Sequence, residues 1–177
     1  LYNWLLGIAH QGMTENFRMN RLLMWIQPEN YSSGIGYQTV QGLYAIGSGG
    51  LFGKGLGKSL QKLGFIPESQ NDMIFSIICE ELGLFGAMCI ILVFALMLWR
   101  IIHIAQNAPD LFGTMLAAGV FAHVAVQVVL NIAVVTNFIP NTGVSLPFIS
   151  YGGTASFFLL LEMGIVLNIS SKIRLER

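Results

Sequence analysis

The sequence has little charge and almost no cysteine. Only 10% of its 177 residues are charged, and nine basic residues balance nine acidic ones. This is far below the roughly 25% of soluble domains, so the composition excludes an ordinary soluble enzyme and a charge-rich disordered chain. The zero net charge excludes a basic field for polyanions, and we expect no nucleic acid among the partners. Cys79 and Cys89 lie in one apolar run and indicate neither a disulfide framework nor a metal site.

Long apolar segments take the place of charge. Hydrophobic residues make up 54% of the chain, and residues 82–99 carry no charge over 18 positions. A run of this length nearly crosses the ~30 Å hydrocarbon layer of a bilayer. We therefore predict an all-α polytopic membrane protein with transmembrane helices at 73–104, 111–138 and 154–170. The remaining segments are predicted as the end of a truncated transmembrane helix (1–10), a large, partly re-entrant loop (11–72), a second loop (139–153) and a tail (171–177).

Lysine and arginine in the short loops predict the orientation in the membrane. The turn after the first span carries Arg100, whereas loop 139–153 carries no charge. Because short cytoplasmic loops are enriched in lysine and arginine, the C-terminus is predicted to be cytoplasmic and both loops extracellular. The tail adds Lys172, Arg174 and Arg177 to the cytoplasmic side. The long loop opposes this with five cations, but loops of such length count little in the rule.

Several polar residues interrupt the apolar spans. His123, Gln127 and Asn131 recur every four residues, which places them on one helical face. Because polar groups facing lipid are costly, this face should point into a helix bundle or a wet cavity. It either holds the bundle together by interhelical hydrogen bonds or forms part of a functional pathway. Glu162 presents the same two alternatives one helix later.

The glycine-rich segment GSGGLFGKGLGKS, residues 47–59, invites comparison with a phosphate-binding loop. The spacing excludes a Walker motif, because a loop ending in Gly57-Lys58-Ser59 would need glycine where Phe52 stands. Two interpretations remain. The backbone-exposed loop and its lysines could meet an anionic head group, or the segment could be a flexible re-entrant turn with solvated lysines.

Asp72 lies where polar sequence gives way to the first span. Ser69-x-x-Asp72 fits a capping box, with Ser69 at the N-cap and Asp72 at the third helical position. The alternative is functional, since a carboxylate at the mouth of a membrane helix is well placed to act on a lipid head group. The residues alone leave both interpretations open.

Three stretches together carry a resemblance to a known family. They resemble, in this order, the large extracellular loop with its following helix, the penultimate helix and the last external loop of the SEDS family (shape, elongation, division and sporulation). This family contains the FtsW, RodA and SpoVE proteins, and residues 142–153 are nearer FtsW and SpoVE than RodA. The stretches are GYQTVQGLYAIGSGGLFGKGLGKSLQKLGFIPESQNDMIFSIICEELGLFG (36–86), DLFGTMLAAGV (110–120) followed by Gln127 and Asn131, and TGVSLPFISYGGT (142–154).

The resemblance implies a bundle of ten transmembrane helices, of which this chain would form the C-terminal portion. It implies a peptidoglycan glycosyltransferase that polymerises lipid II into glycan strands and releases undecaprenyl pyrophosphate, for bacterial cell division or cell shape. The implied location is the bacterial plasma membrane, and the implied partners are a class B penicillin-binding protein, lipid II and membrane lipid. Without the preceding helices much of the substrate groove is missing, so we expect residues 1–177 alone to be inactive.

The resemblance also assigns residues. Asp72 matches the acidic residue of the family's PE-x-x-x-D-x-I-F motif and would accept the proton of an attacking sugar hydroxyl. The leaving group is a diphosphate, so no carboxylic acid is required opposite. Cations would compensate its charge, and a divalent Mg or Mn ion is the candidate cofactor. No other cofactor is expected. The substrate-binding candidates are Lys54, Lys58, Lys62, Glu68, Gln70, Ser150 and Tyr151.

The sequence departs from the family pattern next to this aspartate. The family often has a histidine and a hydroxyl residue before it and phenylalanine after it, whereas this chain has Gln70, Asn71 and Met73. The carboxylate is retained, and no histidine stands directly before it in this chain.

Two other function classes explain part of the pattern. A flippase for lipid-linked cell-wall precursors would use polar intramembrane groups and an anion-friendly loop. A non-catalytic scaffold for a penicillin-binding protein would need the loops alone. A polymerisation assay with labelled lipid II separates these classes from the enzyme.

Overall fold

The structure is a computed structural model that describes residues 21, 24–26, 35–59 and 71–173. Its helices are α3 (Ile35–Gly49), α4 (Ile74–Gln106), α5 (Leu111–Val135) and α6 (Gly153–Lys172), and the described part contains no strand. Three of them, α4, α5 and α6, are long and apolar enough to cross a membrane. The all-α membrane fold is therefore confirmed. The predicted segment 1–10 and residues 174–177 of the predicted tail 171–177 lie outside the described residues.

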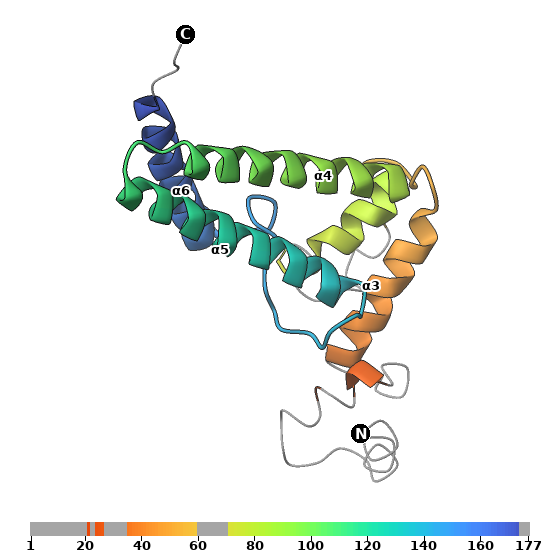
Figure 1. The fold of residues 1–177 in the computed structure, drawn as a ribbon. Coiled ribbons are helices and arrows are strands. Elements are labelled where there is room, and N and C mark those ends of the chain that lie inside the picture. Colours follow the sequence, from red (N-terminus) through yellow and green to blue (C-terminus); the bar gives the residue numbers. More distant parts are fainter. Residues whose placement is uncertain (1–20, 22–23, 27–34, 60–70, 174–177) are drawn as a thin grey trace.

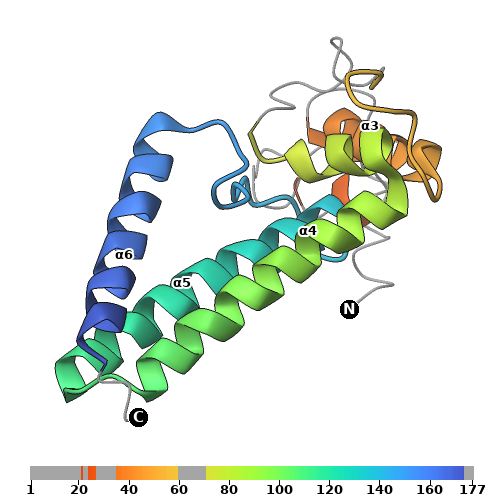
Figure 2. The ribbon, with the colours of Figure 1, turned by 90° about the horizontal axis from the view of Figure 1, so that it is seen from above.

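The helices form a paired core with two elements attached. Figure 2 shows α4 and α5 running side by side, with α3 at the end where α4 begins. The last helix, α6, lies beside the start of α5 at its own C-terminal end and diverges from the pair toward Gly153 (Figure 2). Many large apolar side chains of α4 and α6 remain exposed, as expected for surfaces that face lipid or further helices.

Helix α3 lies inside the segment that was predicted as a loop. Its buried face carries only small residues, which are Gly36, Thr39, Gly42, Ala45 and Gly49. Small side chains let two helix backbones approach closely, and a Cβ on Gly49 would collide with the carbonyl group of Cys79. The stripe of small residues therefore holds α3 against the first turns of α4.

The first span is not the single continuous helix that was predicted. Gly83 has φ 70° and ψ −169°, a backbone conformation that breaks α4 into a short first part and a long second part. Figure 1 shows the two parts meeting at an angle, with the chain after α3 next to the junction. Glycine is required because other residues rarely adopt this φ and because a Cβ here would collide with the backbone nitrogen of Gly53.

The glycine-rich loop satisfies the backbone groups that the break exposes. Four hydrogen bonds join the two segments: Lys54 N to Glu80 O and Gly55 N to Glu81 O, both 2.9 Å, Leu84 N to Gly50 O at 2.9 Å, and Phe85 N to Leu51 O at 3.1 Å. The loop thus accepts from the start of the second part and donates to the end of the first part. A helix end in an apolar environment needs such partners, so loop and break stabilise each other.

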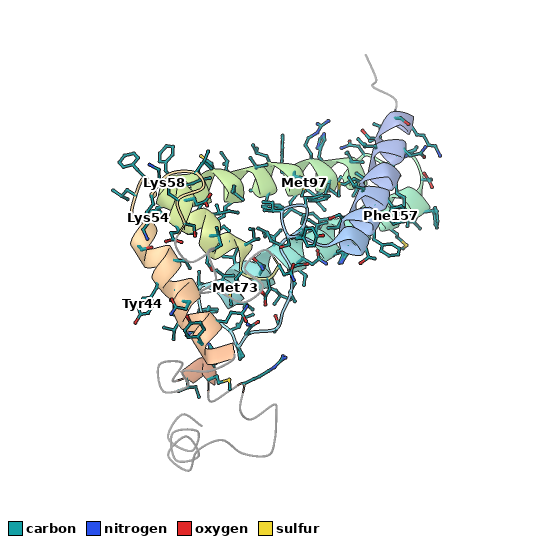
Figure 3. All side chains as sticks on the ribbon, turned by 180° about the vertical axis from the view of Figure 1, so that it is seen from behind. Tyr44, Lys54, Lys58, Met73, Met97 and Phe157 are labelled. Atoms are coloured by element: carbon teal, nitrogen blue, oxygen red, sulfur yellow. The ribbon has the colours of Figure 1, made fainter. Side chains whose placement is uncertain are left out.

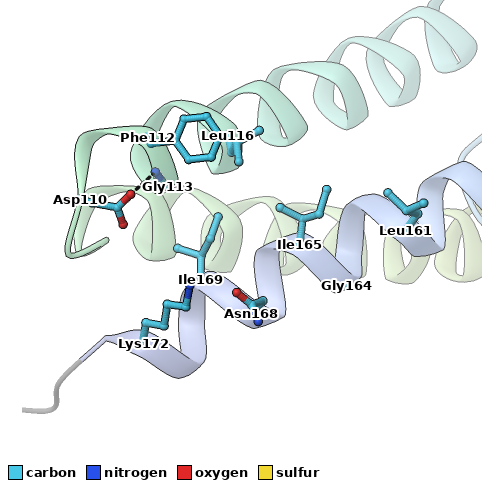
Figure 4. A pocket seen from close by; sticks show the side chains of 10 residues that line it. All are labelled: Asp110, Phe112, Gly113, Leu116, Leu161, Gly164, Ile165, Asn168, Ile169 and Lys172. Carbon is cyan, nitrogen blue, oxygen red and sulfur yellow. Dashed lines mark hydrogen bonds between the residues drawn. The ribbon is translucent and has the colours of Figure 1, made fainter.

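The other end of the α4–α5 pair is closed by a capped turn. Asp110 is the N-cap of α5, and its carboxylate accepts a hydrogen bond from Gly113 N at 3.1 Å. A cavity of about 450 Å³ lies there between the start of α5 and the end of α6 (Figure 4). Lys172 is among the residues that line this cavity. The cavity lies near the C-terminal end of α4, whereas Asp72 precedes the N-terminal end.

Gly83→Ala should destabilise the full-length protein carrying this segment by at least about 2 kcal/mol, because it adds a left-handed alanine and a collision with Gly53. Gly119→Ala is the control, since a Cβ at Gly119 in α5 meets nothing within 4 Å. The measurement is the thermal unfolding midpoint in detergent. Equal midpoints for the two variants would contradict the account of the break.

Candidate functional site

Asp72 lies in the turn immediately before α4. The helix begins at Ile74 with Met73 as its N-cap, and no side chain caps it. Asp72 therefore precedes the helix instead of occupying its third position, and the capping-box interpretation is wrong for this residue. Ser69 lies outside the described residues. The functional interpretation of Asp72 stays a prediction.

Contacts from three separate elements converge on Asn71 and Asp72. Gln38 of α3 donates a hydrogen bond from Nε2 to Asp72 Oδ1 at 3.1 Å. Asn131 of α5 donates from Nδ2 to the backbone oxygen of Asp72 at 2.8 Å. Ser150, just before α6, donates from Oγ to the backbone oxygen of Asn71 at 2.6 Å. The aspartate is thus held by both its backbone and its carboxylate.

Asn131 connects the site to the second loop. Its side chain is fully buried, and the same Nδ2 also donates to the backbone oxygen of Val144 at 2.8 Å. One amide therefore joins α5, the start of α4 and the loop after α5. The inward-facing prediction is confirmed for Asn131, and its role is to hold these elements together by hydrogen bonds.

Of the other polar residues of that face, His123 connects α5 to α6, and Gln127 contacts His123 within α5. His123 Nδ1 lies 3.0 Å from both carboxylate oxygens of Glu162, and Gln127 Nε2 lies 2.9 Å from His123 Nε2. Glu162 is therefore not isolated in the membrane, because it pairs with a neighbouring helix. The contact between His123 and Glu162 therefore fits the first alternative, in which polar side chains hold the bundle together by hydrogen bonds between helices.

Ser150 and Tyr151, predicted as substrate-binding residues, differ in their surroundings. Ser150 is buried, and its hydroxyl also accepts from Leu146 N at 2.7 Å, so it holds two backbone segments together. Tyr151 is 78% exposed. Both line an open cavity of about 480 Å³ that also includes Ile74, two residues after Asp72. The structure therefore places Tyr151 beside the site as an available side chain and Ser150 as part of its frame.

The predicted lysines are not equivalent. Lys54 Nζ lies 2.7 Å from Oε1 of Glu80, whose side chain is fully buried. The Ser59 hydroxyl donates to the other oxygen of that carboxylate. The charge of Lys54 is therefore already matched, and the interpretation of this segment as a flexible turn with solvated lysines is wrong for Lys54. Lys58 is exposed (Figure 3).

Three of the predicted site residues, Lys62, Glu68 and Gln70, lie outside the described residues. Within residues 35–59 and 71–173, no group of three or more His, Cys, Asp or Glu side chains could hold a metal ion. A divalent cation at this site stays a prediction that rests on the chemistry of a diphosphate.

Sequence reasoning missed two members of the site and its frame. Gln38 lies next to the small-residue face of α3, and a polar amide beside such a stripe is a signal that could have drawn attention to it. Glu80 is a charge beside an apolar run, but its partner Lys54 lies 26 residues away and no sequence pattern joins them.

Asn131→Leu should lower the free energy of unfolding of the full-length protein by roughly 1–3 kcal/mol, because two backbone oxygens lose their donor. Val129→Leu is the matched control, since Val129 is 64% exposed on the same helix. Unfolding in denaturant measures both. An Asn131 variant as stable as the control would refute the framing role of this amide.

The comparisons with known proteins agree with this architecture. The FtsW/RodA/SpoVE family, described as "Cell cycle protein", matches residues 4–175. The chain is 46% identical over 166 residues to stage V sporulation protein E of Bacillus subtilis, covering 94% of this chain and 45% of that protein. It is 44% identical over 159 residues to a probable peptidoglycan glycosyltransferase FtsW of Trichlorobacter lovleyi, covering 90% and 42%. The chain thus spans less than half the length of these curated relatives.

Two solved structures share the fold. One, titled "Structural coordination of polymerization and crosslinking by a peptidoglycan synthase complex", has a TM-score of 0.68 at 22% identity, covering 99% of this chain and 50% of that chain. The other is the crystal structure of a mutant of the rod shape determining protein RodA of Thermus thermophilus. Its TM-score is 0.58 at 23% identity, covering 97% and 64%. With the family match over nearly its whole length, the chain belongs to the FtsW/RodA/SpoVE family of membrane proteins and is of the FtsW and SpoVE type.

Proposed function

We propose that the protein carrying this segment is a peptidoglycan glycosyltransferase that polymerises lipid II into glycan strands. The observation that carries the proposal is the placement of Asp72, a carboxylate at the mouth of a membrane helix that groups from α3, α5 and the loop before α6 hold in place. The names of several relatives support the same activity, since they are probable peptidoglycan glycosyltransferases.

The reaction needs a general base but no general acid. A sugar hydroxyl of one lipid II unit attacks the anomeric carbon of the next, and the bond from that carbon to the diphosphate breaks. Asp72 accepts the proton of the attacking hydroxyl. The departing undecaprenyl pyrophosphate is a stable anion, so it needs charge compensation and no proton donor.

The charge of the diphosphate needs a cationic partner, and the described part of the glycine-rich loop offers Lys58. Lys58 is exposed in the glycine-rich loop, whereas Lys54 is occupied by Glu80. Lys58 therefore takes the head-group role proposed for this loop, together with Lys62. A divalent Mg or Mn ion would add positive charge, and Glu68 would position the loop or bind that ion. Tyr151 supplies an exposed aromatic surface beside the same site.

The site faces the outside of the bacterial plasma membrane in this proposal. The short-loop charges support a cytoplasmic C-terminus and an extracellular position for residues 139–153. Lipid II and the surrounding membrane lipid are the ligands, and a class B penicillin-binding protein is the partner that crosslinks the product. One of the structural neighbours is titled as a peptidoglycan synthase complex that combines polymerisation with crosslinking, which supports such a partner.

Asp72→Asn should lower polymerisation of labelled lipid II by at least about a hundredfold, because an amide cannot accept the proton. The assay uses the full-length protein with its penicillin-binding partner at matched amounts. Asp110→Asn is the control, since Asp110 is an exposed carboxylate at a helix start, at the opposite end of α4. It should polymerise at the normal rate.

Normal polymerisation by the Asp72→Asn variant would refute the assignment of Asp72 as the general base. Movement of intact lipid II across the liposome membrane without polymer formation would indicate a flippase. If neither activity is found, the non-catalytic scaffold is the remaining alternative.

The orientation is tested by cysteine labelling in intact cells. After Cys79 and Cys89 are replaced, Thr142→Cys should react with an impermeant thiol reagent and Ser171→Cys should not, since both positions are exposed on the protein but lie on opposite sides of the membrane. The reverse pattern would overturn the orientation and move Asp72 to the cytoplasmic side.

A further inference from the structure

We propose that Gln38 is a positioning residue for Asp72, and that its side-chain amide fixes the direction in which the carboxylate accepts a proton. This inference rests on the proposed function. Its geometric basis is the 3.1 Å hydrogen bond from Gln38 Nε2 to Asp72 Oδ1, which joins residues 34 positions apart.

The chemistry of the two groups decides which end of the amide faces Asp72. An ionised carboxylate only accepts hydrogen bonds, whereas an amide has one accepting and one donating end. Only the NH₂ group of Gln38 can therefore face the base in its proton-accepting form. A donor to a carboxylate makes a charge-assisted hydrogen bond, which stabilises the ionised form and restricts its rotation.

Gln38 is itself held by the packing of its helix. It precedes Thr39, which is buried, and Gly42 lies one turn further on, where an added Cβ would be 3.2 Å from Ser76 Oγ of α4. The close approach of α3 and α4 therefore fixes the distance from which Gln38 reaches across. A rigid helix is a more accurate support for such a contact than a loop would be.

The contacts around Asp72 differ in whether they reach its backbone or its carboxylate. Asn131 and Ser150 bind the backbone oxygens of Asp72 and Asn71, so they place the residue without touching its carboxylate. Gln38 binds the carboxylate itself. Loss of a backbone contact should therefore affect folding first, whereas loss of the Gln38 amide should affect turnover first.

The test compares Gln38→Met, Gln38→Glu and Gln41→Met in the full-length protein with its penicillin-binding partner, using lipid II as substrate. Gln38→Met keeps the length of the side chain but removes the donor. Gln38→Glu keeps the shape and puts a second carboxylate beside the first. Gln41→Met is the matched control, because Gln41 lies one turn further along α3 and is equally half-buried.

We expect Gln38→Met to lower kcat by about tenfold, as for loss of one charge-assisted hydrogen bond, with the KM for lipid II within about twofold of the original. Gln38→Glu should lose at least as much turnover, and Gln41→Met should retain it. Thermal midpoints and complex formation are measured for each variant, and those of Gln38→Glu should stay near the original.

Three results would overturn the inference, and they are distinguishable from failure of the proposed function. Full turnover in both Gln38 variants, while Asp72→Asn is inactive, would leave the base in place and remove the positioning role. A rise in KM alone would make Gln38 a substrate contact. A loss of turnover that matches a loss of folded complex would make it structural. If Asp72→Asn itself polymerises normally, the proposed base fails first.

Discussion

Backbone N–H and C=O groups left without partners in an apolar environment cost several kcal/mol each, and a helix that breaks near the membrane exposes them at two new ends. α4 breaks at Gly83, and residues 50–55 supply the partners for both ends. The glycines of the loop allow the two backbones to approach within hydrogen-bonding distance. The buried Glu80 carboxylate adds an ion pair with Lys54, so a charge that would be costly alone becomes part of the same junction.

The position of Asp72 depends on this junction. The break turns the first part of α4 against α3, which brings Gln38 to the aspartate at the start of the helix. The same arrangement places that start within reach of Asn131 and Ser150. The glycine-rich loop thus acts on the backbone of α4, and through it on the orientation of a carboxylate outside the loop, while its exposed Lys58 has the proposed head-group role.

The sequence predicted those parts of the fold that hydropathy and short-range spacing determine. The three membrane helices follow from apolar runs, and the inward face of Asn131 follows from helical periodicity. Asp72 was selected by the family motif, while the capping-box alternative failed because α4 begins at Ile74. The break at Gly83 and the pairing of Lys54 with Glu80 could not be predicted, because both arise from contacts between segments more than twenty residues apart.

Amide hydrogen exchange of the full-length protein in lipid nanodiscs tests the central claim most directly. The amides of Lys54 and Gly55 lie in a loop, but their N–H groups donate to Glu80 O and Glu81 O in α4. If the loop closes the break, these two amides should exchange as slowly as those of α3. Exchange at the rate of an unstructured peptide would mean that the loop is not docked, and the account of how Asp72 is placed would be contradicted.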